Sequence, residues 1–514
     1  MKRYLPLAVC FFAGCCLLLY ACSKKDTPAS LLDIDPSKKN IMLPAPAGKD
    51  SIMINADVNW TITGMPSWLT VTPATGSGST KVILVYTANT TTNERSVTLT
   101  LQSSGTGGTS IPINIVQAQP DVVIDLFTQH AGGDSIVSIN GTGFSPLIAE
   151  NQVKINGGIA QVKTAAINLL TVIVPKKIGS GRIQVTVNTK ADTSDYDFKY
   201  DWKGIVTVVA GGIQGHLDGT GTNARFDGPA GIKFDAAGNL FIADYLNFKV
   251  RKMTPSGVVS TLPGRIPAWN DPTGPNTDFS LPTDIAIDAA GTVYVVEFNG
   301  NAISRITPSG VVSILAGGDI NSGYADGIGT AAKFYHPAYI TLEPSGSMLV
   351  TDNKNHRIRR ITTAGVVTTV AGSVQAYADG TGANAQFNTP FGITPDNAGN
   401  YLVADFYNNR IRKVTPAGVV TSFAGSGSFG SADGTLATAQ IYQPQAIAMD
   451  NQGNIYCSDN NGYSTLRWIT PAGQVNTISL NTSILSIQGI AIQPDGTVYL
   501  SDYYNDRICK LLIL

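Results

Sequence analysis

Charged side chains are scarce in this sequence. Asp, Glu, Lys and Arg make up 14% of its 514 residues, and the formal net charge is −1, whereas about a quarter of residues are charged in an average soluble protein. Because no basic field is present to hold phosphates, we expect no binding to nucleic acid. The apolar share of 43% excludes wholesale disorder, which requires low hydrophobicity and high net charge.

Cysteine is nearly absent from the body of the chain. Four of the 6 cysteines lie within the first 22 residues, which leaves Cys457 and Cys509. Two remaining cysteines could pair with each other. Each of them, however, lies in a strand pattern of a different repeat unit, so we expect two buried free thiols.

Long apolar runs are missing except at the N-terminus. There, a short basic segment precedes an apolar stretch from Leu5 to Ala21. The stretch is shorter than the about 20 residues of a membrane span and has the layout of a signal peptide. Its end, with Cys22 after Ala21, resembles a bacterial lipobox, although Tyr20 departs from the strict pattern.

The lipobox resemblance implies an outer membrane lipoprotein, which we expect to face the cell exterior with lipid attached to Cys22. An ordinary cleaved secretion signal is the alternative. The corresponding segments are a lipoprotein signal peptide over 1–22 and a polar tether over 23–31.

Residues 32–119 alternate apolar and polar positions in short runs, a pattern that predicts a β-sandwich. The segment contains Trp60, Ser67-Trp68-Leu69-Thr70-Val71, Pro73 to Gly78, Asn93-Glu94-Arg95 and Val116-Gln117. With these residues it resembles a BACON domain, a family typical of Bacteroidetes surface proteins and proposed to bind carbohydrate or mucin. A spacer role is the alternative, and we expect Trp68 to fill the core.

Residues 121–200 form a second predicted sandwich. Gly141, Gly143, Gly157 and Gly179 mark turns between short apolar runs, where a positive φ favours glycine. The run Ile139 to Phe144, together with these turns, resembles the IPT/TIG immunoglobulin-like fold. The resemblance implies a stalk module without catalytic residues.

The rest of the chain, residues 204–514, repeats itself. The first two residues of one predicted strand recur six times at intervals of 53 to 55 residues, from Ile205-Val206 to Gln474-Val475. Each unit contains four strand patterns, which is typical of propeller blades. The last unit lacks a fourth strand, so we expect Ile205 to Val209 to supply it and close the ring. The units resemble NHL repeats, as in Asn239 to Arg251.

The predicted fold is therefore all-β, with two small β-sandwich domains followed by a six-bladed β-propeller. Residues that recur in most blades are assigned to the scaffold. Asp405 with Arg410 is expected to be such a scaffold ion pair, as are Asp352 with Arg357 and Asp502 with Arg507. Phe226, Phe279, Phe334 and Phe387 recur as core wedges, and Asp218, Asp326, Asp379 and Asp433 are expected to cap a short helical turn.

Loop lengths differ between the two propeller faces. The connections between second and third strands and those from one blade to the next are long and emerge on one face, where function concentrates. Side chains there vary between blades, as a site for an asymmetric molecule requires. The expected ligand-binding residues on this long-loop face are Tyr245, Asp284, Phe298, His336, Tyr339, Phe391, Tyr407, Gln445, Gln488 and Tyr504. Tyr339 and Phe391 are expected to flank one ring.

The sequence favours a non-catalytic surface protein that captures a glycan, or a protein, on this face. We expect a monomer with no cofactor and no metal, joined to the membrane through Cys22. An adhesive, protein-binding surface module is one alternative. A propeller lyase or hydrolase is another, but catalytic zinc needs about three converging ligands, and His216, His336 and His356 fall in three different places.

Overall fold

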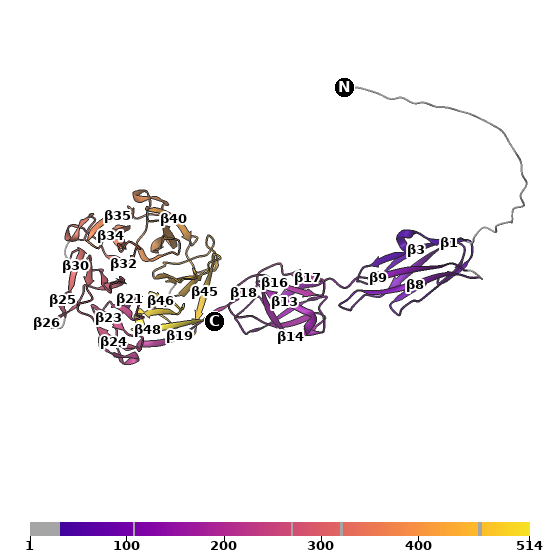
Figure 1. The fold of residues 1–514 in the computed structure, drawn as a ribbon, viewed down its shortest axis with the longest axis horizontal. Coiled ribbons are helices and arrows are strands. Elements are labelled where there is room, and N and C mark those ends of the chain that lie inside the picture. Colours follow the sequence, from indigo (N-terminus) through magenta and orange to yellow (C-terminus); the bar gives the residue numbers. More distant parts are fainter. Residues whose placement is uncertain (1–30, 106–107, 269–270, 319–321, 461–464) are drawn as a thin grey trace, which may run out of the picture.

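The computed structural model describes residues 31–105, 108–268, 271–318, 322–460 and 465–514. The predicted signal peptide, Cys22 and most of the tether lie outside these residues. The described elements are β-strands and short 3₁₀ turns, so the all-β prediction is confirmed. They form three lobes in a row, with the C-terminus where the second lobe meets the third (Figure 1).

The first lobe is a sandwich of two sheets, with strand orders β1-β3-β7-β5 and β2-β9-β8-β4-β6. Trp60 fills its core: it is 1% exposed, and its indole N–H donates to Gly78 O at 3.0 Å. The prediction for Trp68 is wrong, because that ring is half-buried at the edge of the core with the Arg95 guanidinium 4.6 Å above it. The strands are β1 (Leu32–Ile34), β2 (Asn40–Leu43), β3 (Gly48–Ala56), β4 (Asn59–Thr63), β5 (Leu69–Thr72), β6 (Thr75–Ser77), β7 (Thr80–Tyr86), β8 (Arg95–Ser103) and β9 (Ser110–Gln117).

The second lobe has a seven-stranded sheet of order β10-β12-β15-β14-β13-β16-β17 and a short β11-β18 pair. Its buried residues form one continuous core with those of the last two propeller blades. It touches the first lobe through Asn188, whose side chain donates to Thr92 O at 2.6 Å. The strands are β10 (Val123–Phe127), β11 (His130–Ala131), β12 (Ile136–Thr142), β13 (Asn151–Ile155), β14 (Gly158–Ala166), β15 (Leu169–Ile173), β16 (Ile183–Val187), β17 (Lys190–Thr193) and β18 (Lys199–Tyr200).

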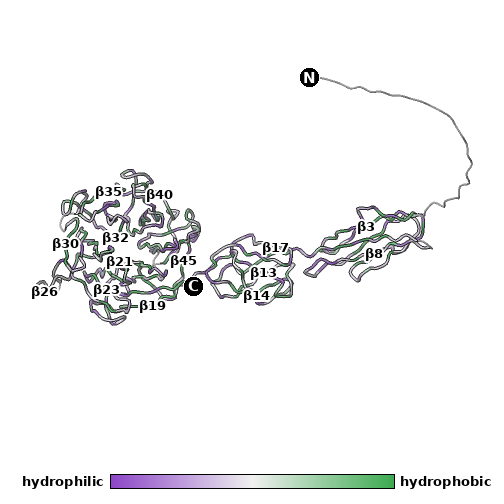
Figure 2. Tube along the Cα trace, in the orientation of Figure 1, coloured by the Kyte–Doolittle hydropathy of each residue, from purple (hydrophilic) through white to green (hydrophobic). Residues whose placement is uncertain are grey.

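The third lobe is a ring of antiparallel four-stranded meanders, six within the described residues. The first strand of each meander contacts the first strand of the next, in the closed order β21, β27, β32, β37, β42, β46 and back to β21. Hydrophobic residues recur along these strands (Figure 2). The meanders are β21 to β24 (Pro229–Phe234, Leu240–Asp244, Lys249–Met253, Val258–Thr261), β27 to β30 (Pro282–Ile287, Val293–Glu297, Ala302–Ile306, Val312–Gly317), β32 to β35 (Pro337–Leu342, Met348–Asp352, Arg357–Ile361, Val366–Gly372), β37 to β40 (Pro390–Pro395, Tyr401–Asp405, Arg410–Val414, Val419–Ala424), β42 to β45 (Ile447–Met449, Ile455–Asp459, Thr465–Ile469, Gln474–Leu480), and β46 to β48 (Ile487–Ile492, Val498–Asp502, Arg507–Ile513) with β19 (Trp202–Gly211).

Strand β19 closes the ring as predicted. It pairs antiparallel with β48, from Gly204 opposite Ile513 to Gly211 opposite Arg507. Its first residues also pair parallel with β45, so that one strand links the last two blades. The edge of β48, the last strand of the chain, is covered by β19 in this way.

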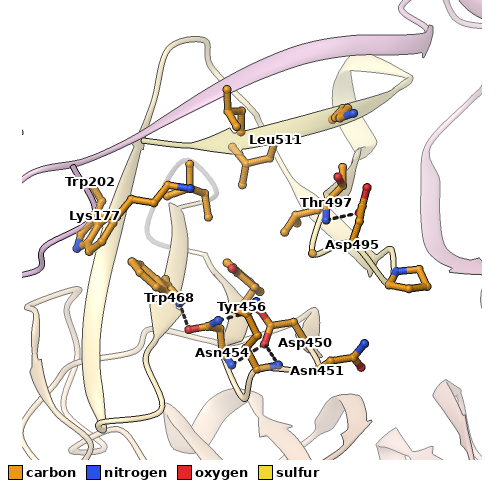
Figure 3. Close-up of a pocket in the computed structure, with 17 residues that line it drawn as sticks. Lys177, Trp202, Asp450, Asn451, Asn454, Tyr456, Trp468, Asp495, Thr497 and Leu511 are labelled. Atoms are coloured by element: carbon orange, nitrogen blue, oxygen red, sulfur yellow. Dashed lines mark hydrogen bonds between the residues drawn. The ribbon is translucent and has the colours of Figure 1, made fainter. Parts of the chain in front are cut away.

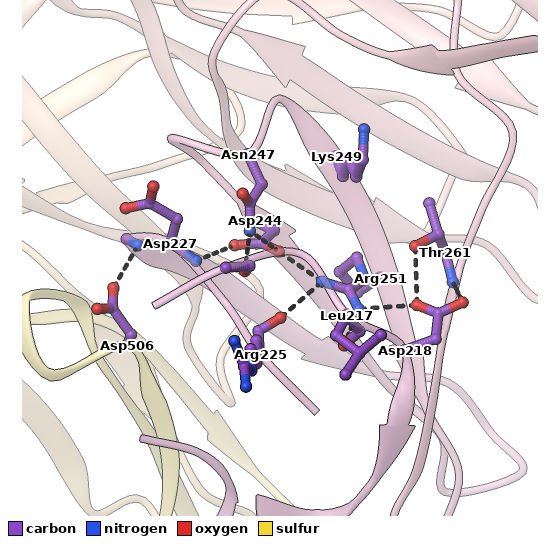
Figure 4. Close-up of polar contacts among 12 residues, drawn as sticks. Leu217, Asp218, Arg225, Asp227, Asp244, Asn247, Lys249, Arg251, Thr261 and Asp506 are labelled. Atoms are coloured by element: carbon purple, nitrogen blue, oxygen red, sulfur yellow. Dashed lines mark hydrogen bonds and ion pairs between the residues drawn. The ribbon is translucent and has the colours of Figure 1, made fainter. Parts of the chain in front are cut away.

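In four of the six blades a fully buried arginine, rather than the predicted one, binds two aspartates, and Figure 4 shows this for Arg251 of the first blade. Arg251 is fully buried and donates to Asp244 and Asp218 at 2.7 Å each, and its guanidinium lies 5.3 Å from the Phe226 ring. The predicted pairing of Asp405 with Arg410 and of Asp352 with Arg357 is wrong. The carboxylates bind Arg412 and Arg359 instead, which lie two residues further along the strand and reach a second aspartate.

Two blades lack this arginine and compensate differently. Cys509 occupies its position in the last blade, so Arg507 pairs with Asp502, as predicted. In the second blade the Ser304 hydroxyl donates to Glu297, and the Arg265 guanidinium forms the ion pair with the same carboxylate.

The predicted capping role of the Asp-Gly pairs is also wrong. Asp218 accepts from Arg251 and from Thr261 N, while the 3₁₀ turn Gly221–Asn223 begins after Thr220 without a side-chain cap. The phenylalanine wedges are confirmed, and Cys457 and Cys509 are free and buried as predicted. The wedges Phe226, Phe279, Phe334 and Phe387 are all fully buried.

Candidate functional site

A cavity of about 190 Å³ opens at the centre of the long-loop face. The structure brings together in its lining seven of the ten expected ligand-binding residues. These are Tyr245, Phe298, Tyr339, Phe391, Gln445, Gln488 and Tyr504. Ala230, Thr283, Ala338 and Tyr503 complete the lining.

The floor of this mouth cavity is a plug across the propeller channel. Tyr339, on β32, donates its phenol hydrogen to Gln488 O at 2.6 Å. Since β32 and β46 belong to opposite blades, this bond spans the channel. The amides of Gln445 and Gln488 hydrogen-bond to each other beside it. The hydroxyl of Tyr339 is therefore used inside the protein, and burial raises the pKa of this phenol well above its usual value.

The walls come from the connections between second and third strands. Tyr503 and Tyr504 lie in the 3₁₀ turn Tyr503–Asn505, which follows β47 directly. Their rings are 4.9 Å apart at nearly a right angle, and Tyr245 lies 6.0 Å from Tyr503. Tyr504 remains 68% exposed. Most of its side chain is thus open to solvent.

The lining carries no formal charge at neutral pH, since it consists of aromatic, amide, hydroxyl and alanine side chains. Aromatic rings bind the apolar faces of a ligand, while a few placed polar groups fix its orientation. A charged group would have no partner here and would be costly to desolvate. The cavity therefore suits a neutral ligand with both apolar faces and hydroxyl groups.

Three of the expected residues are not part of this cavity. Asp284 is 1% exposed and accepts from Ile340 N at 3.0 Å. It is the residue after Thr283, which lines the cavity, and it lies deeper in the protein than that residue. The His336 ring stacks on the Phe298 ring with centroids 4.3 Å apart and does not line the cavity. Tyr407 is 51% exposed but lies outside the lining.

The expected slot between Tyr339 and Phe391 is also not formed. Their rings contact each other edge-on, with centroids 6.3 Å apart and an interplanar angle of 75°. No third ring can stack between them, so they form part of the floor.

Asp284 gives a pH-dependent stability that can be measured. Burial raises the pKa of its carboxyl to about 6, and Lys233 opposes this rise. Because an unfolded aspartate titrates near about 3.9, the folded state binds the proton more tightly, and stability is lost as the pH rises from 4 through 6. An asparagine side chain at this position has no carboxyl to ionise, so the variant does not lose this stability as the pH rises. We expect Asp284→Asn to gain roughly 2 kcal/mol relative to the parent protein between pH 4 and pH 8, measured by urea unfolding.

Asp495 provides a control of opposite sign. Hydrogen bonds from Thr497 lower the pKa of this exposed carboxyl, so its contribution is lost as the pH falls. Asp495→Asn should therefore show no gain in stability over the parent protein at pH 8, and a small loss is the expected sign. An Asp284→Asn effect that is equal at pH 4 and pH 8 would contradict the assignment.

The histidines of the propeller do not converge. His356 Nδ1 accepts from Thr389 N at 3.0 Å, whereas His216 lines a shallow depression at the outer rim. Within the described residues no group of three His, Cys, Asp or Glu side chains could hold a metal ion.

Family comparisons match the two N-terminal lobes. Residues 58–118 match the BACON family, described as "Putative binding domain, N-terminal", and residues 124–200 match the IPT/TIG domain. The chain carries a BACON domain followed by an IPT/TIG domain. The BACON match begins at β4, so it leaves out the first three strands of the sandwich.

The chain also has NHL-repeat relatives. NHL repeat-containing protein 2 of Gallus gallus is 24% identical over 323 residues, which cover 55% of this chain and 43% of that protein. Protein SUPPRESSOR OF QUENCHING 1, chloroplastic, of Arabidopsis thaliana is 25% identical over 285 residues, or 52% of this chain and 27% of the relative. This chain thus spans less than half the length of either relative.

Two solved structures from bacteria are similar to this chain at low sequence identity. An auxiliary nutrient binding protein from Bacteroides thetaiotaomicron is 17% identical with a TM-score of 0.47, covering 77% of this chain and 98% of its own. Virginiamycin B lyase from Staphylococcus aureus is 19% identical with a TM-score of 0.42, covering 61% of this chain and all of its own. Neither likeness identifies a ligand or a reaction. Among the described residues, no helix is long and apolar enough to cross a bilayer.

Proposed function

We propose that the protein is a non-catalytic cell-surface binding protein that captures the end of a neutral glycan in the mouth cavity of its propeller. The observation that carries this proposal is the uncharged, aromatic and amide-lined cavity, into which seven of the ten expected ligand-binding residues converge. Four of these, Tyr339, Phe391, Gln445 and Gln488, lie at positions that differ between blades. A scaffold position would repeat in every blade, whereas a site for one asymmetric ligand needs different side chains around the ring.

The size of the cavity supports a small ligand group. Its volume of about 190 Å³ is below the volume of roughly 300–1,000 Å³ that is typical of sites enclosing a whole small molecule. A single sugar ring can enter, while the rest of a longer chain would remain outside on the exposed face of Tyr504. The amides of Gln445 and Gln488 can exchange their mutual bond for bonds to sugar hydroxyls.

The other two lobes are suited to holding this site at a distance from the membrane. The BACON and IPT/TIG domains follow each other in an extended row before the propeller (Figure 1). In the proposal, lipid on Cys22 anchors a monomer to the outer membrane, and the two sandwiches hold the propeller mouth away from the outer leaflet. A protein ligand on the same face is the alternative outcome of the binding test.

Tyr504→Ala should weaken glycan binding at least tenfold. The phenol ring is exposed, so its loss removes contact area without leaving a cavity in the core, and aromatic contacts contribute about 0.5–1.5 kcal/mol beyond their buried area. A glycan array on the soluble protein identifies the ligand, and calorimetric titration then gives its dissociation constant. The melting temperature should stay within about 1 °C of the parent value, because surface substitutions change stability little.

Tyr407→Ala is the matched control. Tyr407 is the middle residue of the 3₁₀ turn Phe406–Asn408, as Tyr504 is of its own turn, but it does not line the cavity. Binding should be unchanged in this variant. Equal losses in both variants, or no loss in Tyr504→Ala, would remove the mouth cavity as the glycan site.

A further inference from the structure

A second pocket lies where the IPT/TIG domain meets the last two blades (Figure 3). It has a volume of about 470 Å³, which is more than twice that of the mouth cavity. Lys177 of the IPT/TIG domain faces propeller residues of β43, β44 and β48 across it. Ligand sites occur preferentially at such domain interfaces.

One wall of this junction pocket is aromatic. Trp202 and Trp468 meet edge to face with centroids 4.2 Å apart. The indole N–H of Trp468 donates to Asn454 Oδ1 at 3.1 Å, which holds its ring in place. Tyr456 adds a third ring to the lining. The apolar face of a sugar ring can pack on such a surface.

Four charged residues line the pocket. Asp495 and Lys510 attract each other, whereas Lys177 is supplied by the IPT/TIG domain and Asp450 by the propeller. Lys177 extends from beside Trp202 toward the pocket (Figure 3), and its ammonium has no ion-pair partner within the described residues. The backbone of this residue has a φ of 55°, uncommon for a non-glycine residue, and its N–H donates to Tyr200 Oη at 2.9 Å. The root of the side chain is thus fixed over the pocket.

The propeller side of the pocket is different. Asp450 is 8% exposed, and its carboxylate accepts from Gln452 N, Asn454 N and Asn454 Nδ2. Its hydrogen-bonding capacity is therefore taken up by its own turn. The side-chain amides of Asn451 and Gln452 line the pocket without a hydrogen bond to any described residue.

We propose that the junction pocket binds a carboxylated sugar, a hexuronate residue. Its carboxylate lies on the Lys177 ammonium, a charge-assisted contact, while its ring packs on Trp468. Its hydroxyls reach the amides of Asn451 and Gln452. The site is distinct from the mouth cavity, whose lining is uncharged, and it stands whether or not the mouth binds a neutral glycan.

The test is calorimetric titration of the full mature chain with methyl α-D-galacturonide. Methyl α-D-galactoside, which lacks the carboxylate, should bind at least tenfold more weakly. Lys177→Met should weaken galacturonide binding at least tenfold, because it keeps the length of the side chain and removes the charge. Lys176→Met is the matched control, since Lys176 pairs with Asp134 at 3.0 Å and does not line the pocket.

Lys176→Met and Tyr504→Ala should both leave galacturonide binding unchanged. Loss of galacturonide binding in Tyr504→Ala would place the sugar at the propeller mouth and overturn the proposal. So would the absence of galacturonide binding to the parent chain, equal binding of the galactoside, or equal affinities of the Lys177→Met and parent chains.

Discussion

A chain that starts at residue 212 should be much less stable than one that starts at residue 201. The shorter chain lacks β19, which pairs with β48 along Gly204 to Gly211 and with β45 at its beginning. Buried Val206 and Ala210 are lost with it. Each ladder bond contributes about 0.5–1.5 kcal/mol, and a buried valine about 1.5–3 kcal/mol. We expect a loss of several kcal/mol, or on the order of 10 °C in the melting temperature.

Both chains lack the two sandwich domains, so the comparison isolates β19 and its few flanking residues. The shorter chain should also associate with itself, because the exposed edge of β48 can pair with another strand. Scanning calorimetry and size-exclusion chromatography measure the two effects. Equal melting temperatures would show that β19 does not close the ring.

Arg359→Met should destabilise the propeller by about 3–5 kcal/mol, the range for removing one partner of a buried ion pair. The guanidinium is fully buried, donates to Asp352 and Asp326 at 2.7 Å each, and lies 5.2 Å from the Phe334 ring. Without it, the buried carboxylate of Asp352 has no cation beside it. Urea unfolding at neutral pH gives the difference in free energy.

Arg357→Met distinguishes this pairing from the one that the repeat spacing suggests. Arg357 is opposite Asp352 in the strand register, but it is half-buried and its guanidinium lies over the Tyr324 ring at 4.0 Å. We expect a loss below about 1 kcal/mol, as for an exposed cation–π contact. A larger loss for Arg357→Met than for Arg359→Met would restore the pairing of Asp352 with Arg357.

The sequence predicts most of the architecture because the repeat shows which positions are equivalent. The missing fourth strand of the last unit identifies Ile205 to Val209 as its replacement, and the structure pairs these residues with β48. Repetition alone does not distinguish Arg410 from Arg412, because both recur in the strand. Burial distinguishes the two arginines. It depends on the loop between β35 and β37, which brings Asp379 to the Arg412 guanidinium that also binds Asp405.

Variation between blades predicts much of the mouth cavity, but it carries no information on depth. Asp284 varies from blade to blade and yet lies below the surface, whereas Tyr503 lines the cavity beside Tyr504. The junction pocket cannot be foreseen at all. Lys177 and Trp468 are far apart in the sequence, and they approach only because β19 carries the IPT/TIG domain against the last blades.

Hydrogen–deuterium exchange of the mature chain, with and without the glycan found on the array, tests the proposed binding site most directly. A ligand in the mouth cavity should slow exchange of the backbone amides around Tyr504, Gln445 and Gln488, and leave residues 32–119 unchanged. Protection confined to residues 32–119 would assign the glycan to the BACON domain and contradict the proposed role of the propeller.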